Sequence, residues 1–273
     1  MPSLPTIDQL MRLQRAYYEA ISTWERRPWG MIGLNLDNPT SHDSNHAYAD
    51  TRLTPAQLPE VLNDVAAWYA ARAGGEIEPR LRFHVPPNDP QLVSLGESSG
   101  WKSDQIEQTW RAWPTAAGHE QPAQVPGMTL SVVGSDSLDA LLAAHDGALE
   151  PDVAHRRRGV WSALSASDRV NCLLAQIHGD PAAALACVWN AEWGSLEDVY
   201  TRRRFRRRGI CSAMIRHMQA LAVDRGAAGL YLYDNEDAPD RIYARAGFEL
   251  VARPRQAQLW LGALHPSHQP TLL

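Results

Sequence analysis

The strongest chemical signal in the sequence is an arginine-rich segment that ends in glycine, TRRRFRRRGICS at 201–212. It joins a predicted strand at 196–201 to a predicted helix at 209–225. The first turn of a helix leaves backbone N–H groups unpaired, and the helix dipole adds partial positive charge there. Gly209 lets a ligand approach the backbone closely, and the arginines add charge for phosphate. The pattern predicts a site for pyrophosphate or a similar anion.

Alternating and helical hydrophobic patterns place this segment within a longer series of elements. The series is a strand at 128–133, a helix at 136–145, a hairpin of 170–178 and 183–189, the strand at 196–201, the helix at 209–225, a strand at 230–233, a short helix at 239–246, and one or more strands at 249–261. Glycines at 226 and 247 end the last two helices. The order predicts an α/β fold with a mixed sheet.

The first 115 residues contain a second series of elements. These are a helix at 7–24, strands at 31–36 and 47–49, a helix from 54 to about 73, a strand at 81–85, a short helix at 89–99 and an alternating segment at 105–113. Residues 114–126 are rich in proline, alanine and glycine, which is typical of a linker. We therefore expect domains at 1–115 and 127–273, joined by a linker at 116–126.

The two halves repeat the same order. Each has a long helix, a strand, a short helix, a Gly-aromatic pair (Gly100-Trp101 and Gly247-Phe248) and a further strand. Helix–strand alternation is common, so chance is the simpler alternative. A repeat of this length nevertheless favours a duplicated domain over a solenoid unit.

Three elements in the C-terminal half together resemble a known family. Residues 206–211 (RRRGIC) resemble the Arg/Gln-x-x-Gly-x-Gly/Ala signature of the GCN5-related N-acetyltransferase (GNAT) superfamily. Residues 197–201 resemble its central strand, and 243–248 (YARAGF) resemble its Tyr-x-x-x-Gly-Phe element. The resemblance covers 128–261 and reaches the first half only through the repeat. It implies the acyl-CoA N-acyltransferase (GNAT) fold in two tandem halves, an α+β mixed-sheet form of the α/β class, with a degenerate N-terminal half.

The resemblance also implies an acetyl-CoA site, with acetyl-CoA as cosubstrate. The implied binding residues are Val199, Tyr200, Thr201, Arg206, Arg207, Arg208, Gly209, Ile210, Cys211, Ser212 and Asn235. Backbone groups of Val199 and Thr201 would pair with the pantetheine arm, and the amides of residues 207–212 would hold the pyrophosphate. Tyr243 would protonate the departing thiolate, which assists its departure because a free thiol has a pKa of about 8.5. Two departures are Cys211, where the family has Gly or Ala, and Asn235, which lies one residue farther from Tyr243 than expected.

The family often uses a carboxylate on the central strand to accept the amine's proton, which makes Glu197 and Asp198 the candidate bases. Strand alternation places Glu197 on the face of Val199 and Thr201, and Asp198 on the other face. A bulge would reverse these faces, so the choice between the two stays open. Glu192 is a weaker third candidate, and either acid could instead pair with the arginines.

The N-terminal half lacks the corresponding groups. With Gly100-Trp101 aligned to Gly247-Phe248, the position of Tyr243 is taken by Gly96. The segment 46–57 has no glycine turn and little positive charge. We expect this half to have lost its CoA site and to serve as scaffold, with one wall of the acceptor pocket as a further role.

Composition excludes several other classes. A net charge of −5 and a pI of about 6.0 argue against a nucleic-acid-binding protein, although the arginine run alone could suggest one. The ten histidines and three cysteines show no metal-ligand spacing, so no metal is expected. No signal peptide or membrane-spanning run is present, which together with the unpaired cysteine pattern predicts a cytoplasmic protein.

The combined hypothesis is an N-acetyltransferase that transfers acetyl directly from acetyl-CoA to a primary amine of a small molecule or peptide. The alternative is a catalytically silent CoA-binding sensor or structural protein, because Cys211 and the degenerate first half depart from the family pattern. The sequence does not identify the amine acceptor, and it is compatible with a monomer or a homodimer.

Overall fold

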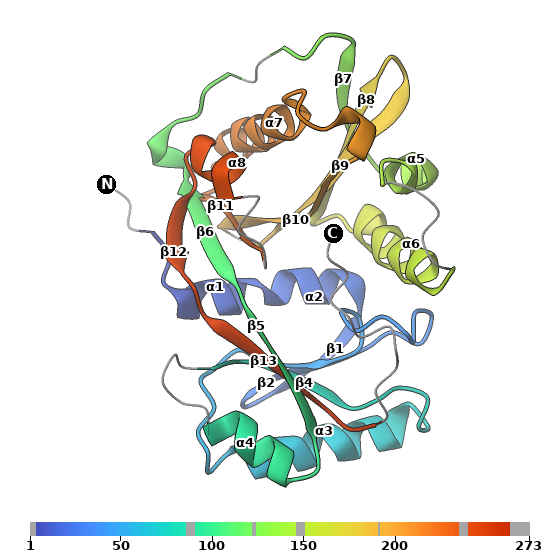
Figure 1. Cartoon of the computed structure of the whole chain (residues 1–273), viewed down its shortest axis with the longest axis vertical. Coiled ribbons are helices and arrows are strands. Elements are labelled where there is room, and N and C mark those ends of the chain that lie inside the picture. Colours follow the sequence, from blue (N-terminus) through green and yellow to red (C-terminus); the bar gives the residue numbers. More distant parts are fainter. Residues whose placement is uncertain are drawn as a thin grey trace.

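Two mixed β-sheets organise the molecule, as Figure 1 shows. The computed structural model describes residues 4–85, 91–121, 124–145, 151–190, 192–234 and 240–262. The N-terminal sheet has the order β1-β2-β3-β4-β13-β5, and the C-terminal sheet has the order β12-β6-β11-β10-β9-β8-β7. In each sheet the pairs are antiparallel except one, β3–β4 in the first and β10–β11 in the second.

The strands of the N-terminal sheet are β1 (Thr23–Arg27), β2 (Gly30–Leu34), β3 (Ala47–Ala49), β4 (Arg80–Val85), β5 (Lys102–Glu107) and β13 (Arg255–Trp260). Those of the C-terminal sheet are β6 (Thr109–Pro114), β7 (Met128–Val133), β8 (Val170–Ile177), β9 (Asp180–Trp189), β10 (Trp193–Thr201), β11 (Gly229–Asp234) and β12 (Glu249–Ala252). The hairpin of β8 and β9 turns at residues 178 and 179, both with positive φ, as a tight two-residue turn requires.

Helices cover the outer faces of both sheets and fill the space between them (Figure 1). They are α1 (Ile7–Leu13), α2 (Arg15–Ile21), α3 (Leu58–Arg72), α4 (Gln91–Ser98), α5 (Leu138–Ala143), α6 (Pro151–Ala166), α7 (Ile210–Asp224) and α8 (Asp240–Arg245). Short 3₁₀ turns occur at Thr115–Ala117, Ser135–Ser137 and Arg203–Phe205. Helices α3 and α4 pack on one sheet, α7 and α8 on the other, and α1 and α2 lie between the two.

The predicted internal repeat is confirmed at the level of single hydrogen bonds. Gly100 and Gly247 follow their short helices with φ of +84° and +86°. The next residue closes the turn in both halves: Trp101 N–H donates to the Gly96 carbonyl at 3.1 Å, and Phe248 N–H donates to the Tyr243 carbonyl at 3.0 Å. The same helix C-cap therefore occurs at both positions that the sequence alignment paired.

Each sheet takes one strand from the other half of the sequence. β6 lies between β11 and β12 in the C-terminal sheet, and β13 lies between β4 and β5 in the N-terminal sheet. The alternating segment at 105–113 therefore does not form one strand; it divides at Gln108, whose N–H donates to the Pro254 carbonyl at 2.9 Å. In the same way, 249–261 divides into β12 and β13. The proposed domains thus exchange the strands at equivalent positions.

The first predicted helix, 7–24, is wrong in two details. It breaks at Gln14 into α1 and α2, and residues 23 and 24 already belong to β1. The helix α6 is absent from the predicted series, since few of its positions are apolar and its first turns carry the arginines at 156–158. Both helical pairs, α1–α2 and α5–α6, line the seam between the halves, where Tyr17, Tyr18 and Trp161 are buried.

Candidate functional site

The central strand β10 separates from its parallel neighbour β11 partway along its length. The two strands pair at Trp193–Gly229, Gly194–Leu230 and Ser195–Tyr231, and no pairing follows beyond that point among the described residues. Both strands continue, β10 to Thr201 and β11 to Asp234. Val199 therefore has no strand partner on the β11 side, and the Thr201 carbonyl accepts a hydrogen bond from Arg206. This is the stretch of β10 where the sequence predicts a pantetheine arm.

A β-bulge interrupts β10 at the predicted bases. Its register against β9 shifts between Glu197 and Tyr200, and Asp198 has a left-handed φ of +51°. The simple alternation prediction is therefore wrong: Val199 packs against the hydrophobic cluster on the α7 side, while Glu197 faces the N-terminal half. Because of the bulge, the side chain of Glu197 does not share a face with Val199. It points instead toward the interface between the two halves.

The junction between β10 and α7 is a turn with two left-handed residues, Arg207 (φ +62°) and Gly209 (φ +81°). Such turns direct successive N–H groups to one side, which suits an anion. Gly209 is the N-cap of α7 and no side chain caps the helix there. A Cβ at Gly209 would meet nothing closer than 3.9 Å, so the backbone conformation, not crowding, favours glycine. The amides of residues 210–212 begin the helix without intrahelical acceptors.

The arginine run does not present all its side chains to this turn. Arg202 and Arg204 both contact Asp180, and Arg204 and Arg208 lie over the ring of Phe205. Arg206 is held by its Nε–H bond to the Thr201 carbonyl at 2.9 Å and lies over the Tyr200 ring. Arg207, which is exposed, has no ion pair within the described residues. Of Arg206, Arg207 and Arg208, Arg207 is thus the one whose side chain has the fewest contacts with the rest of the protein.

The other predicted residues at the helix start have mixed positions. Ile210 is buried in the core, and Ser212 is exposed. Cys211, where the family has a smaller residue, packs against the same core, and burial raises the pKa of its thiol to about 12. A neutral thiol is a poor nucleophile, so Cys211 acts as a small apolar residue here. Asn235 lies outside the described residues.

Among the candidate bases, Glu197 has the surroundings that best suit a proton acceptor. Only 9% of it is exposed, and its Oε1 accepts hydrogen bonds from Gln14 Nε2 at 3.1 Å and from Ser195 Oγ. Burial raises its pKa to about 7, against the lowering effect of these two bonds and with a smaller contribution from the carboxylate of Asp198. A carboxyl group with this pKa can accept a proton near neutral pH.

The surroundings of Asp198 suit a proton acceptor less well than those of Glu197. It is partly exposed on the bulge, and burial raises its pKa while the charge of Arg157 lowers it. Glu192, the third candidate, is exposed at the opposite end of β10. The structure thus gives Glu197 the enclosed position that neither of the others has.

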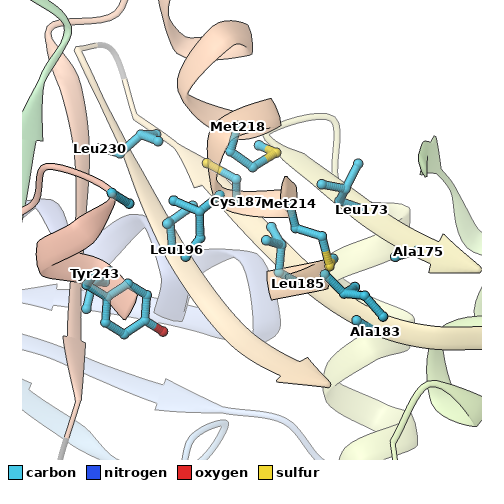
Figure 2. Packing of buried hydrophobic residues seen from close by; sticks show 14 of the residues in the cluster. Leu173, Ala175, Ala183, Leu185, Cys187, Leu196, Met214, Met218, Leu230 and Tyr243 are labelled. Atoms are coloured by element: carbon cyan, nitrogen blue, oxygen red, sulfur yellow. The ribbon is translucent and has the colours of Figure 1, made fainter. Parts of the chain in front are cut away.

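Tyr243 lies on α8 and is 8% exposed, with its ring 6.0 Å from that of Phe248. Figure 2 shows the ring beside β10, with the hydroxyl oxygen directed toward that strand. Burial raises the pKa of the phenol, and the nearby Cys211, Asp234 and Glu197 raise it further. The phenol is therefore protonated at neutral pH and can donate a proton. Glu197 and Tyr243 lie on opposite sides of β10.

Two residues of the site were not predicted. Ser195 could have been found, because residues two apart on a strand share a face and Ser195 precedes Glu197 by two. Gln14 could not have been found, because it lies 183 positions away in the sequence and at a break that the helical pattern does not reveal. Its amide is buried, and it brings the N-terminal half into contact with the candidate base.

The described residues contain no cluster of His, Cys, Asp or Glu that could hold a metal ion. All three cysteines are free thiols. Within the part of the chain that the structure describes, no helix has the length and apolar composition needed to cross a membrane.

Comparison with known proteins agrees with this geometry. Residues 138–248 match the model of the acetyltransferase (GNAT) family. A search of curated protein sequences finds no match. Among solved structures, the chain is similar to a GCN5-related N-acetyltransferase from Kribbella flavida, with a TM-score of 0.69, 18% identity, and coverage of 96% of this chain and 98% of that one.

Two further structures share the fold. A conserved protein of unknown function from Staphylococcus epidermidis has a TM-score of 0.64 and 15% identity, over 89% of this chain and 95% of that one. A tandem GNAT protein from the clavulanic acid biosynthesis pathway has a TM-score of 0.57 and 16% identity, over 86% and 79%. Family and fold together support acyl transfer in general. Residues 138–248 thus match the acetyltransferase (GNAT) family, and the chain as a whole shares its fold with GCN5-related N-acetyltransferase structures, a tandem GNAT protein among them.

Proposed function

We propose that the C-terminal half transfers an acetyl group from acetyl-CoA directly to a primary amine of a small-molecule or peptide acceptor. The observation that carries the proposal is the enclosed Glu197, with a pKa of about 7, beside the point where β10 and β11 separate. A base with this pKa suits deprotonation of an ammonium group near neutral pH. The gap between the strands and the Gly209 turn would hold the two ends of the cosubstrate.

The residues present fit acetyl-CoA. The uncapped start of α7, its left-handed Gly209 and the exposed Arg207 together suit a pyrophosphate. Backbone groups of Val199, which has no strand partner on the β11 side, suit the amides of a pantetheine arm. Arg206 and Arg208 would support the turn from their contacts with Thr201 and Phe205 rather than reach the ligand. When bound, acetyl-CoA supplies the activated acyl group.

The chain's own groups would carry the protons. Glu197 accepts a proton from the acceptor's ammonium group, which leaves a nitrogen lone pair to form the new bond to the acetyl carbon. The carbon–sulfur bond breaks, and the electron pair leaves with sulfur. Tyr243 donates its phenolic proton to that thiolate, and the second proton that the nitrogen must lose to become an amide passes through water to the Tyr243 phenolate. Glu197 then releases its proton to solvent, so that one proton leaves overall. Because no covalent enzyme intermediate is needed, positioning of the two substrates would supply much of the rate.

Isothermal titration with acetyl-CoA tests the site. We expect micromolar binding to the wild-type protein and its loss in a variant with Arg207→Ala, Arg208→Ala and Gly209→Glu. A panel of primary amines is then screened by release of the CoA thiol. Failure of the wild-type protein to bind acetyl-CoA would overturn the proposal, and binding without turnover on any amine would favour a catalytically silent CoA-binding protein.

A further inference from the structure

A second concave site lies at the seam between the two halves, at the end of β10 away from the proposed CoA site. It is an open cleft of about 560 Å³, within the range of small-ligand sites. Its lining comes from the end of α1, the start of α2 and β1 in one half, and from the end of β9 and the end of α7 in the other. Asn190 lines it and lies beside Trp193 at the start of β10, and Val199 is six residues farther along that strand, which corresponds to roughly 20 Å.

Arginines dominate the lining. The cleft has five of them, Arg12, Arg15, Arg26, Arg169 and Arg225, against two carboxylates, Glu19 and Asp168. In a chain with a net charge of −5, this is a local reversal of sign. Because guanidinium groups bind phosphate and carboxylate oxygens through paired hydrogen bonds, a converging set of them favours a ligand with several anionic groups.

The cations exceed what the protein itself neutralises. Arg26 and Arg169 share the single carboxylate of Glu19, the second at 3.6 Å. Arg12 and Arg225 are exposed and form no ion pair within the described residues. Arg225 instead lies over the Trp189 ring, 4.7 Å from its centroid, which fixes the guanidinium plane at the cleft. Arg15 is paired with the buried Asp50 and contributes least.

Asn190 forms part of the cleft wall and is held in a fixed orientation. The Oδ1 of Asn190 accepts hydrogen bonds from the N–H groups of Glu192 and Trp193, at 3.1 and 2.9 Å. These bonds fix the orientation of the amide, so its Nδ2 points away from them. That Nδ2 is buried and has no hydrogen-bond partner among the described residues. Because this atom has almost no exposed surface, a ligand in the cleft does not reach it, and Asn190 contributes a fixed wall to the cleft.

We propose that this cleft binds a small polyanion, with two or more phosphate or carboxylate groups held by Arg12, Arg225, Arg26 and Arg169. The concave shape and the acidic character of the whole chain favour a small molecule over a nucleic acid. The proposal does not depend on acetyl transfer.

The cleft lies next to Gln14, so a bound ligand is linked to the proposed active site through this residue. Gln14, which donates to Glu197, lies between Arg12 and Arg15 at the break of α1 and α2. A ligand that fixes the residues at this break would influence the orientation of the Glu197 carboxylate through its hydrogen bond with Gln14. This consequence, unlike the binding itself, rests on the proposed function.

Binding is tested by isothermal titration and thermal unfolding with tripolyphosphate, pyrophosphate, citrate and a single-stranded oligonucleotide, each as a separate probe. The protein is compared with three variants. Gly209→Glu removes the proposed pyrophosphate site, Arg12→Ala with Arg225→Ala removes two cations from the cleft, and Arg52→Ala with Arg158→Ala removes the same charge from exposed positions elsewhere. Unfolding without ligand shows whether each variant folds, and Arg12→Ala alone replaces the double variant if that one does not.

We expect at least one of the first three probes to bind and to raise the unfolding temperature of the wild-type protein, the Gly209→Glu variant and the Arg52/Arg158 control. Affinity should fall by roughly tenfold or more in the Arg12/Arg225 variant. Loss of binding in Gly209→Glu would assign the anion to the α7 turn and overturn the proposal. Equal binding by the cleft variant and its control would do the same, as would tight binding of the oligonucleotide alone. Acetyl-CoA binding, measured in parallel, shows whether the proposed function stands independently.

Discussion

The two halves place a carboxylate at equivalent positions, Glu197 within β10 and Asp50 directly after β3, and hold it in different ways. In the C-terminal half, Gly194 pairs with Leu230, and Glu197 follows three residues later. In the N-terminal half, Ala47 pairs with Leu81, which the repeat aligns with Leu230, and three residues later the chain reaches Asp50. The duplicated fold therefore carries two equivalent acidic positions.

Adjacent residues at the break of α1 and α2 provide the partners. Gln14 donates to Glu197, and Arg15 forms an ion pair with Asp50. A neutral amide leaves the buried carboxylate of Glu197 with a raised pKa, which suits a base. A cation instead offsets the charge of its partner and makes it a structural anion. The comparison teaches that the choice of one partner, not the position on the fold, separates a candidate catalytic base from a structural carboxylate.

The junctions that lead from the central strand into the next helix, α3 in one half and α7 in the other, also differ between the halves. Both lead into helices of 15 residues, α3 and α7. At α7, the left-handed Gly209 opens the first turn and the amides are uncapped. At α3, the first amide, that of Leu58, donates to the Thr54 carbonyl at 3.2 Å, Pro59 has no N–H, and Glu60 adds negative charge. The start of α3 therefore lacks the features that suit the α7 turn to an anion.

The largest expected effect comes from placing the same charge at both junctions. Gly209→Glu puts a side chain on a left-handed residue and a carboxylate where the pyrophosphate would lie, so we expect acetyl-CoA affinity to fall by roughly 1,000-fold or more. The matched Gln57→Glu variant should bind as the wild-type protein does. Isothermal titration measures both. Equal loss in the two variants would mean that the halves are not divided in function.

The two carboxylates should respond in opposite directions when neutralised. Glu197→Gln should lower kcat about 100- to 1,000-fold with unchanged acetyl-CoA affinity. Because the folded-state pKa of Glu197 is raised, its burial costs stability increasingly as pH rises from about 4.5 to 7, so the variant should be more stable than the wild-type protein at pH 8, by about 3 kcal/mol, and similar at pH 4.

The matched Asp50→Asn variant should instead be destabilised at pH 8, by about 1–3 kcal/mol, because it leaves Arg15 without its anion. Chemical denaturation at the two pH values measures both variants. If Glu197→Gln destabilised the protein at pH 8, this would contradict the claim that the charged Glu197 is buried at a cost in stability and is kept for catalysis.

The parts of the candidate site that can be predicted from the sequence are those that lie in local motifs. The Gly209 turn, Tyr243 and the Gly247 cap are each specified within a few residues, so their chemistry is readable from types and spacing. The choice between Glu197 and Asp198 was not readable, since it depends on a one-residue bulge in β10. Gln14 and the exchange of β6 and β13 depend on contacts between distant segments, for which a single sequence carries no local pattern.

The third comparison concerns the acid. Tyr243→Phe removes the proton donor and keeps the ring packed against Phe248, so we expect kcat to fall about 10- to 100-fold with little change in stability. At the equivalent Gly96, a Cβ would lie 2.5 Å from Leu259 of the exchanged strand β13. Gly96→Ala should therefore lower the unfolding temperature and leave the acetyl-CoA affinity and kcat of folded protein unchanged. Steady-state kinetics beside thermal unfolding separates the two; a normal kcat in Tyr243→Phe would remove Tyr243 from the mechanism.

The smallest expected effect is on the link between the halves. The hydrogen bond from Gln14 lowers the pKa of Glu197, so Gln14→Leu should raise it further. The base acts when deprotonated, and kcat/KM therefore rises with pH through this pKa. We expect the acid limb of the profile to move to higher pH by roughly half a unit to one unit, with kcat at high pH nearly unchanged. Gln9→Leu, on the exposed side of the same helix, is the matched control and should leave the profile in place. A drop in rate that is the same at every pH would mean that Gln14 supports the seam by packing alone, and the N-terminal half would then be a scaffold without a part in the chemistry.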